Sequence, residues 1–310
     1  MREFSILLLF YNSETDAIKT SLDSIICQKD VDLELIMADD GSSNNCMDEA
    51  VKYLEEKKYK NYKVLNHPKN VGTVQNLYDA LLLATKKYVH SIGAGDLFYS
   101  ETTLKEIYDH MTKEKSDMSF GKVQGFYKDE AGCIKQFPYC LPADIKAFEK
   151  KNYKRMQKDI IQNHGWIVGA SMFYKTEVLM KYIKTILGKV RYCEDLLQAS
   201  LLLNNENVTY YPHGVFYYEV GTGISTDNSG GNSEKLEKDH NSYWKMMLKQ
   251  NPDNELIKKG YKMQKLQCFK NPLRRKLAII LHNPSYAIMM LKTIAQKKSY
   301  IIKERGCRFR

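Results

Sequence analysis

The chain has 310 residues, of which 43% are hydrophobic and 27% are charged. This length and composition suit one large globular domain or a catalytic domain with an appendage, and they exclude fibrous and low-complexity classes. The net charge of +10 is uneven, because residues 258–310 hold 15 of the 47 basic side chains and one of the 37 acidic ones. The body is therefore close to neutral and the C-terminal region is strongly basic.

The seven cysteines are scattered, odd in number and without a Cys-x-x-Cys pair. This pattern argues against a disulfide framework and a zinc site, and free thiols are typical of a reducing compartment. The first apolar run is too short for a signal peptide, and no run reaches the ~18 apolar residues of a membrane-spanning helix. We expect a cytoplasmic protein, bound peripherally at the inner face of the cell membrane.

The first hundred residues alternate between buried strands and amphipathic helices. Continuous apolar runs at 4–11 and 33–38 predict strands that are buried on both faces of a parallel sheet. Further strands are predicted at 62–65 and 88–92, and helices at 17–26, 47–58, 71–85 and 101–113. This alternation is typical of an α/β unit with a parallel sheet.

The second half is predicted to be more mixed. Strands are expected at 118–137 around a turn at 129–132, and at 166–174, 208–211 and 215–220; helices are expected at 176–187 and 194–203. Residues 138–163 are predicted to form an irregular loop, and the glycine- and serine-rich stretch 221–233 a flexible segment. Helices are expected from there to the end.

Polar residues follow each of the first four predicted strands, at Asn12, Asp39-Asp40, 66–70 and Asp96. Ligands of such sheets bind beyond the carboxyl ends of the strands, so these residues predict a site. A dinucleotide fingerprint is excluded at Gly93-x-Gly95, because its third glycine position is Phe98.

Six motifs stand out along the chain: Tyr11-Asn12, Ser24-Ile25-Ile26-Cys27-Gln28, Asp39-Asp40-Gly41-Ser42, Asn70-Val71-Gly72, Glu194-Asp195 and Gly221-Thr222-Gly223. Taken together, they resemble the motifs of inverting family 2 glycosyltransferases of the bacterial surface-polysaccharide type. The resemblance implies an α/β fold of the GT-A type, with a Rossmann-like nucleotide-binding half and a mixed sheet, followed by a helical C-terminal region. It divides the chain into a catalytic domain at 1–240, with a nucleotide-binding half at 1–115 and an acceptor half at 116–240, and a basic helical region at 241–310.

The resemblance also implies roles for individual residues. Asp40 would contact the nucleotide, Tyr11 would pack on the base and Asp39 would help to hold the loop. Asn12, Lys69 and Asn70 complete the expected nucleotide-binding set. The simpler interpretation is an Asp-Gly turn whose carboxylates cap the next helix.

The acidic motif that holds the metal in this family is reduced here to Gly93-Ala94-Gly95-Asp96. Asp96, together with phosphates and waters, is the expected ligand of Mg²⁺ or Mn²⁺, which would offset the charge of a diphosphate leaving group. The alternative is that Asp96 only caps the following helix.

By the same resemblance Asp195 is the general base, which takes the proton of the acceptor hydroxyl, and Glu194 supports it. Two acids at a helix start are also stabilised by the helix dipole, so capping is the alternative. Trp166 either stacks on a sugar or belongs to the core.

The basic tail mixes apolar side chains such as Leu273 and Leu277 with cations such as Arg274 and Arg275. This pattern favours an anionic membrane surface as a partner, or a helical cap with a charged outer face. No nucleic-acid module accompanies the charge, so nucleic acid is not expected. The expected function is transfer of a hexose from a nucleotide-sugar, UDP-linked, to a saccharide acceptor that is lipid-linked or free. The alternatives are a nucleotidyltransferase and a non-catalytic nucleotide-sugar-binding protein.

Overall fold

The computed structural model describes residues 2–128, 134–138, 142, 144–221 and 231–296. Within them a mixed sheet of nine strands runs in the order β3-β2-β1-β4-β8-β6-β9-β5, and β7 pairs with β6. The strands are β1 (Glu3–Phe10), β2 (Asp32–Asp39), β3 (Tyr62–Asn66), β4 (Tyr88–Gly93), β5 (Leu97–Phe98), β6 (Met118–Lys128), β7 (Ile134–Pro138), β8 (Met172–Lys175) and β9 (Val208–Glu219). The helices are α1 (Thr15–Ile26), α2 (Cys46–Glu56), α3 (Thr73–Leu81), α4 (Thr103–Glu114), α5 (Ile145–Glu149), α6 (Tyr153–Gln157), α7 (Thr176–Ile186), α8 (Leu197–Leu203), α9 (Gly231–Gln250), α10 (Glu255–Gln267), α11 (Pro272–His282) and α12 (Pro284–Gln296).

The predicted α/β unit is confirmed in the first hundred residues. Strands β3, β2, β1 and β4 are parallel, and the register places Phe10 beside Asp39 and Leu9 beside Gly93. The carboxyl ends of these strands therefore meet at one edge of the sheet, as the polar residues after each predicted strand indicated.

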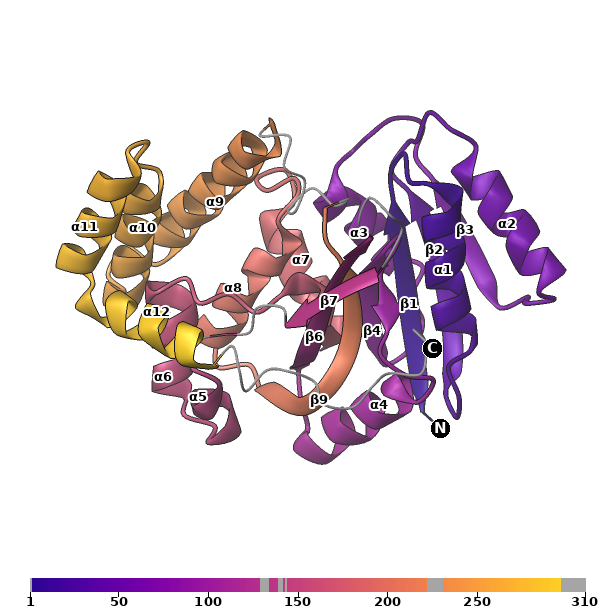
Figure 1. The fold of residues 1–310 in the computed structure, drawn as a ribbon, viewed down its shortest axis with the longest axis horizontal. Coiled ribbons are helices and arrows are strands. Elements are labelled where there is room, and N and C mark those ends of the chain that lie inside the picture. Colours follow the sequence, from indigo (N-terminus) through magenta and orange to yellow (C-terminus); the bar gives the residue numbers. More distant parts are fainter. Residues whose placement is uncertain (1, 129–133, 139–141, 143, 222–230, 297–310) are drawn as a thin grey trace.

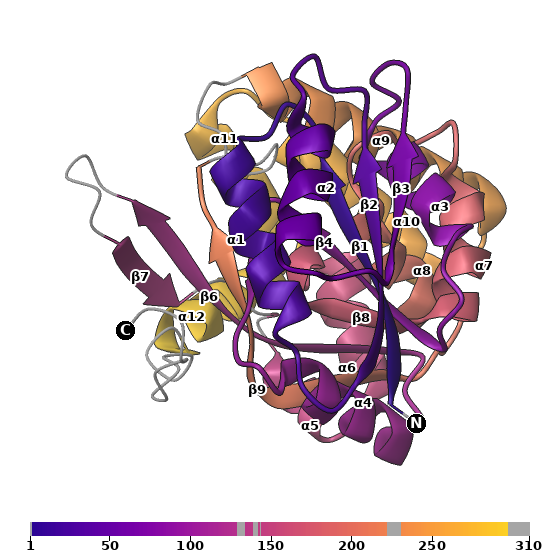
Figure 2. The same ribbon diagram turned by 90° about the vertical axis from the view of Figure 1, so that its right-hand side faces the viewer.

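Helices cover both faces of the sheet because the side chains of β1 alternate between two cores (Figures 1 and 2). Phe4, Ile6 and Leu8 pack with the apolar faces of α1, α2 and α4. Leu7 points the other way and packs in the core that contains α3, α7 and α8. This alternation places the helices in two layers around one central sheet.

Several predictions for the second half are wrong in detail. The irregular loop predicted at 138–163 is wrong for the described residues 144–163, because α5, α6 and a π-helical turn at Lys158–Gln162 form there and bury Phe148, Met156 and Ile160. The strand predicted at 166–174 is limited to β8, and a 3₁₀ turn precedes it. The two strands predicted at 208–220 are one continuous strand, β9, which pairs with β6 through a bulge near Lys122.

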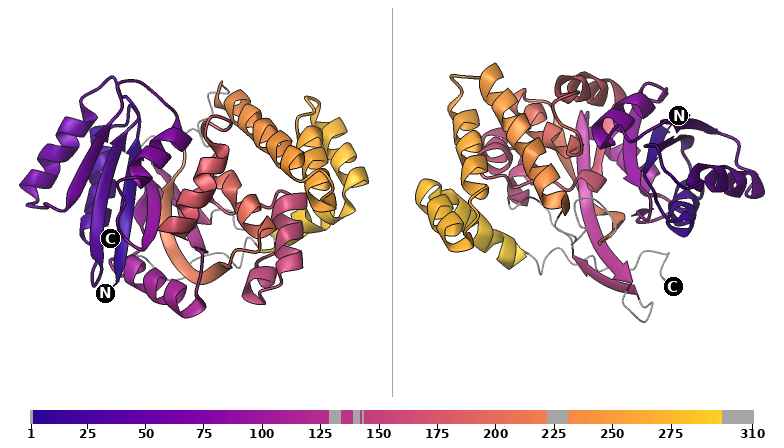
Figure 3. Two further views of the ribbon diagram at one scale, coloured as in Figure 1. Left: turned by 180° about the vertical axis from the view of Figure 1, so that it is seen from behind. Right: turned by 90° about the horizontal axis from the view of Figure 1, so that it is seen from above.

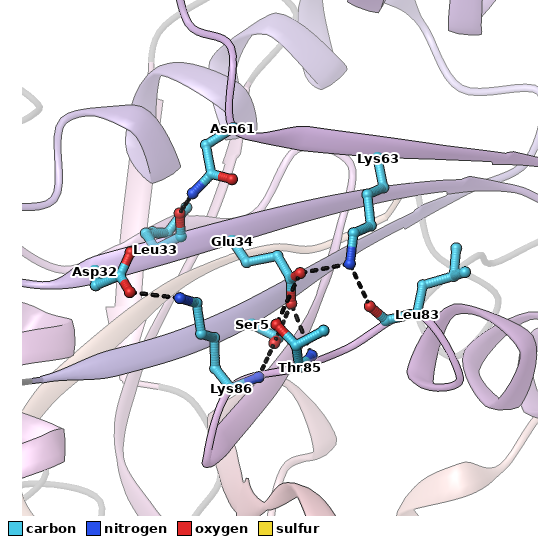
Figure 4. Close-up of polar contacts among 9 residues, drawn as sticks. All are labelled: Ser5, Asp32, Leu33, Glu34, Asn61, Lys63, Leu83, Thr85 and Lys86. Carbon is cyan, nitrogen blue, oxygen red and sulfur yellow. Dashed lines mark hydrogen bonds and ion pairs between the residues drawn. The ribbon is translucent and has the colours of Figure 1, made fainter.

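A charged residue stands inside the sheet at Glu34 on β2 (Figure 4). Its carboxylate accepts hydrogen bonds from Ser5 Oγ at 2.7 Å, Lys63 Nζ at 2.6 Å and the backbone N–H of Thr85 at 2.9 Å. Burial acts to raise the pKa of Glu34, but these hydrogen bonds outweigh it and hold the pKa below its ordinary value. The network ties the amino end of β4 to β1, β2 and β3.

The C-terminal helices lie at the end of the molecule opposite α1 and α2 (Figures 1 and 3). Helix α9 runs unbroken through residues 240 and 241, and its Tyr243 and Trp244 are fully buried in the same core as α7 and α8. A break between α11 and α12 follows His282. No helix in the described part of the chain is long and apolar enough to cross a membrane. Residues 222–230, in the segment expected to be flexible, lie outside the described residues.

Candidate active site

A cleft of about 1630 Å³ opens at the carboxyl ends of β1 and β4. Its walls come from the start of α1, residues 166–170 and 192–195, the end of β9 and the first turns of α9. Most of the residues predicted for the site line it: Tyr11, Asn12, Asp40, Asn70, Asp96, Glu194 and Asp195. Asp39 and Lys69 do not belong to this lining.

Asp40 anchors the loop that follows β3. Its buried carboxylate accepts hydrogen bonds from the backbone N–H groups of Val71 at 2.6 Å and Gly72 at 3.0 Å, and from Asn70 Nδ2 at 2.9 Å. Gly72 has a φ of 95°, a conformation that favours glycine, and it precedes α3 directly. Asp40 therefore faces the cleft and also holds the loop at residues 70–72. The sequence did not indicate this second, structural role.

Asn12 and Asp39 hold the neighbouring turn. Asn12 Oδ1 accepts from the backbone N–H of Ser43 at 2.8 Å, and its own N–H donates to Ser42 Oγ at 2.8 Å. Asp39 accepts from the backbone N–H of Ser42 at 3.1 Å and from its hydroxyl at 2.5 Å. The short polar side chains of this motif thus bind one another and fix the backbone around the strand ends.

Tyr11 and Lys69 project outward. Tyr11 is 49% exposed and lines the cleft, where its aromatic side chain is accessible to a planar ligand. Lys69 is exposed, and its backbone lies against Gly41, where an added Cβ would come within 2.3 Å of the Lys69 carbonyl carbon. Gly41 is therefore required for the close approach of the two loops.

Glu194 and Asp195 lie on the opposite wall, in a 3₁₀ turn that leads into α8. Gly169 faces them: an added Cβ would lie 3.2 Å from Asp195 Cβ and 3.7 Å from a carboxylate oxygen of Glu194. Burial raises the pKa of both groups, and the neighbouring charge of Asp195 raises that of Glu194 further. A carboxylate with a raised pKa is a better proton acceptor than an ordinary one.

Two further residues hold this wall, and no motif pointed to them. Asp239 of α9 accepts hydrogen bonds from the successive backbone N–H groups of Arg191 at 3.0 Å, Tyr192 at 2.5 Å and Cys193 at 3.2 Å. Arg191 in turn donates to Asn70. Because Asp239 lies 46 to 48 residues along the chain from the segment it holds, only the folded chain reveals this contact.

Glu219 lies beside Asp96 at the reduced metal motif. The backbone N–H of Glu219 donates to Asp96 Oδ1 at 2.9 Å, and an added Cβ at Gly95 would come within 2.0 Å of a Glu219 carboxylate oxygen. Glu219 thus fills the space of the side chain that Gly95 lacks. No group of three or more His, Cys, Asp or Glu among the described residues is arranged to hold a metal ion. Two carboxylates with diphosphate oxygens and waters still suit Mg²⁺ or Mn²⁺.

Acidic side chains outnumber basic ones in the cleft. Its described lining contains one lysine, Lys235, and seven acids: Glu14, Asp16, Asp40, Asp96, Glu194, Asp195 and Glu219. An anionic ligand that enters such a cleft needs a counter-charge, which a divalent cation supplies.

The fold and the sequence are similar to those of known glycosyltransferases. An uncharacterised glycosyltransferase of Methanocaldococcus jannaschii is 25% identical over 179 residues, which are 57% of this chain and 57% of that protein, so the match spans little more than half of the relative. S. aureus TarS in complex with UDP-GlcNAc superposes with a TM-score of 0.61 at 17% identity, covering 96% of this chain and 84% of that chain. The mannosyltransferase PcManGT from Pyrobaculum calidifontis, in complex with GDP-Man and Mn²⁺, gives a TM-score of 0.55 at 14% identity, with coverage of 97% and 88%.

These structural neighbours have the GT-A fold that the motifs implied. The model of glycosyl transferase family 2 matches residues 5–183, more than half of the chain, and ends before Glu194-Asp195 and α9. With the strand-end motifs, the mixed sheet and the cleft in place, we conclude that the chain belongs to glycosyl transferase family 2.

Proposed function

We propose that the protein transfers a hexose from a UDP-linked sugar to a saccharide hydroxyl with inversion, in the synthesis of a surface polysaccharide. The proposal is carried by one observation: Glu194 and Asp195 have raised pKa values and face the same cleft as the Asp40 loop. UDP as the nucleotide is supported by the ligands in the TarS complexes.

The reaction follows from the arrangement of the cleft. Asp195 accepts the proton of the acceptor hydroxyl while its oxygen attacks the anomeric carbon from the face opposite the diphosphate. The bond between the anomeric carbon and the phosphate oxygen breaks, and the departing nucleoside diphosphate keeps the electron pair. Asp96 and Glu219 would hold a divalent cation, which when bound offsets the negative charge of the departing group.

The test is a panel of nucleotide-sugars assayed for nucleotide release with and without saccharide acceptors. Sugar transfer with release of UDP supports the proposal. A parallel assay supplies nucleoside triphosphates with sugar phosphates, and release of pyrophosphate there would identify a nucleotidyltransferase. Tight nucleotide-sugar binding without turnover, for any donor of the panel, would identify a binding protein instead.

We further propose that α11 docks on an anionic membrane at the inner face of the cell membrane, where a lipid-linked saccharide would be available. Leu273, Leu277 and Leu281 recur at helical spacing and are 73%, 62% and 81% exposed. Arg274 and Lys276 are exposed beside them. An exposed apolar stripe with adjacent cations fits an interface of apolar tails and anionic head groups.

Vesicle flotation tests this surface in the full chain. We expect binding to phosphatidylglycerol vesicles that weakens with salt and is lost when the three leucines are replaced by serine, and little binding to phosphatidylcholine. Leu82→Ser, at an exposed leucine elsewhere, is the matched control. Equal binding of the triple variant, or none by the native chain, would contradict the proposal.

A further inference from the structure

The cleft wall beside Asp195 is aromatic. Trp166 and His240 both line the cleft, and their rings meet edge-on with centroids 5.9 Å apart. Behind them His164 stacks on Trp244 with centroids 4.8 Å apart and an interplanar angle of 10°. Trp244 is fully buried, whereas Trp166 and His240 are partly exposed. The pair His164 and Trp244 thus supports the pair Trp166 and His240 that lines the cleft.

The supporting rings are fixed by α10. The ring nitrogens of His164 face Gln267 Oε1 at 3.0 Å and the carbonyl oxygen of Gly260 at 3.1 Å. An added Cβ at Gly260 would lie 2.6 Å from the indole of Trp244, so α10 packs directly on that ring. The stack cannot shift without moving a helix, which leaves Trp166 pre-organised at the cleft.

One buried side chain links this wall to the proposed base. Gln198 accepts from the backbone N–H of Ile167 at 2.7 Å and donates to the Ile167 carbonyl at 3.2 Å and to the Asp195 carbonyl at 2.9 Å. The residue next to Trp166 and the backbone of Asp195 therefore share one fully buried amide. Gln198 thus holds the backbone next to Trp166 and the backbone of Asp195 together.

The chemistry of the wall fits a sugar ring. Burial lowers the pKa of His240, so its ring is neutral at neutral pH and the wall is uncharged within an acidic cleft. A pyranose has an apolar C–H face and a rim of hydroxyls, and it matches an aromatic surface flanked by carboxylate acceptors.

We propose that Trp166, backed by His240, is the acceptor subsite: the apolar face of the terminal acceptor sugar packs on the indole and directs one hydroxyl toward Asp195. This inference rests on the proposed function and assigns the acceptor class as a saccharide. The nucleotide loop and Tyr11 stand at the other strand ends, so the donor and the acceptor approach from different walls.

Intrinsic fluorescence can test the subsite, because the chain has two tryptophans, of which Trp166 is partly exposed and Trp244 is fully buried. The probes are methyl glycosides and disaccharides of the common hexoses, added with UDP and Mn²⁺ while acrylamide quenching is recorded. We expect at least one saccharide to shield the indole from acrylamide, as seen in the difference between the native chain and Trp166→Phe. The single-tryptophan variant Trp244→Phe gives the same readout directly if it folds.

The kinetic readout separates this inference from the proposed function. With an active acceptor, Trp166→Ala should raise the acceptor KM about fivefold to tenfold, while calorimetry shows native UDP affinity. His240→Ala should act in the same direction. Shielding by UDP alone, or by no saccharide of the panel, would overturn the subsite although nucleotide binding stands. A native chain that binds no nucleotide would instead overturn the proposed function.

Discussion

One guanidinium nitrogen of Arg191 donates hydrogen bonds to the backbone carbonyl of Asn70 at 3.0 Å and to its side-chain oxygen at 2.8 Å. Asn70 Nδ2 in turn bonds Asp40, and the carbonyl of Arg191 accepts from the backbone N–H of Val74. The segment that leads into Glu194-Asp195 is thereby joined to the predicted nucleotide loop, so one arginine connects the two walls of the cleft.

Arg191→Ala should weaken UDP binding about tenfold, because it removes the charge-assisted hydrogen bonds that hold Asn70. Arg191→Lys should recover only part of it, because lysine keeps the charge but lacks the planar fork. Calorimetry with UDP measures both. Lys189→Ala, at a nearby exposed lysine bonded to the Thr185 carbonyl, is the control and should bind normally. Native affinity in Arg191→Ala would show that the loop holds without it.

Asp40→Asn should affect both binding and stability. Its amide would present N–H donors to the donors of Val71, Gly72 and Asn70, so we expect a loss of about 1–3 kcal/mol in the free energy of unfolding. UDP binding should fall sharply, while Asp16→Asn, at an exposed acid of the same cleft, should alter neither quantity by much. Urea titration and calorimetry separate the effects. A folded Asp40→Asn protein with unchanged UDP affinity would show that Asp40 does not contribute to nucleotide binding.

Asp195→Asn should lower the transfer rate by ~10²–10⁴-fold with little change in UDP affinity. Because burial raises the pKa of Asp195, the native rate should fall on acidification at a higher pH than an ordinary aspartate would cause. Glu194→Gln is the matched control, and its transfer rate should still fall on acidification. A native rate in Asp195→Asn would end its assignment as the base.

The stability of Asp195→Asn to urea also distinguishes a general base from a helix cap. A carboxyl whose pKa is raised in the folded state disfavours folding at neutral pH, where it must be ionised while buried. Asp195→Asn should therefore unfold at the same or a higher urea concentration than the native protein at pH 7. A capping aspartate would instead lose at most ~1 kcal/mol on replacement by asparagine.

Metal binding should be weak and should depend on both Asp96 and Glu219. With two protein carboxylates, Mn²⁺ should bind in the millimolar range and tighten when UDP is present, as measured by the paramagnetic resonance of free Mn²⁺. Asp96→Asn and Glu219→Gln should each weaken Mn²⁺ binding. Glu14→Gln removes a charge from the same cleft, and its Mn²⁺ affinity should remain close to that of the native protein. Full transfer activity in excess chelator would show that no divalent ion is needed.

Acid should destabilise the protein through His90. Burial lowers its pKa to about 4, while its pKa in the unfolded chain is near 6.5, so unfolding takes up a proton below pH 6.5. Stability from the neutral ring is complete above pH 6.5 and is lost as the pH falls toward 4. His90→Phe should reduce the pH dependence of the free energy of unfolding over this range by about 3 kcal/mol. Urea melts at several pH values measure it, and an unchanged slope would contradict the assignment.

The local pattern of the sequence was enough to predict the N-terminal α/β unit and the meeting of Asp40, Asn70 and Asp96 at one edge. The alternation of side chains between the two faces of β1 is a local property of the sequence, and so are the polar residues after each strand. Parallel pairing then brings the carboxyl ends of the strands together. The family motifs likewise predicted Glu194 and Asp195 in the cleft.

Tertiary structure alone decided what holds these residues. Asp239 reaches residues 191–193, Glu219 fills the space beside Gly95, and Trp166 meets His240, all through contacts between segments distant in sequence. Helices α5 and α6 likewise formed in a stretch of weak periodicity, because their few apolar residues are buried by packing on the sheet and neighbouring helices. Such contacts depend on where whole elements pack, and no local pattern of residues encodes that placement.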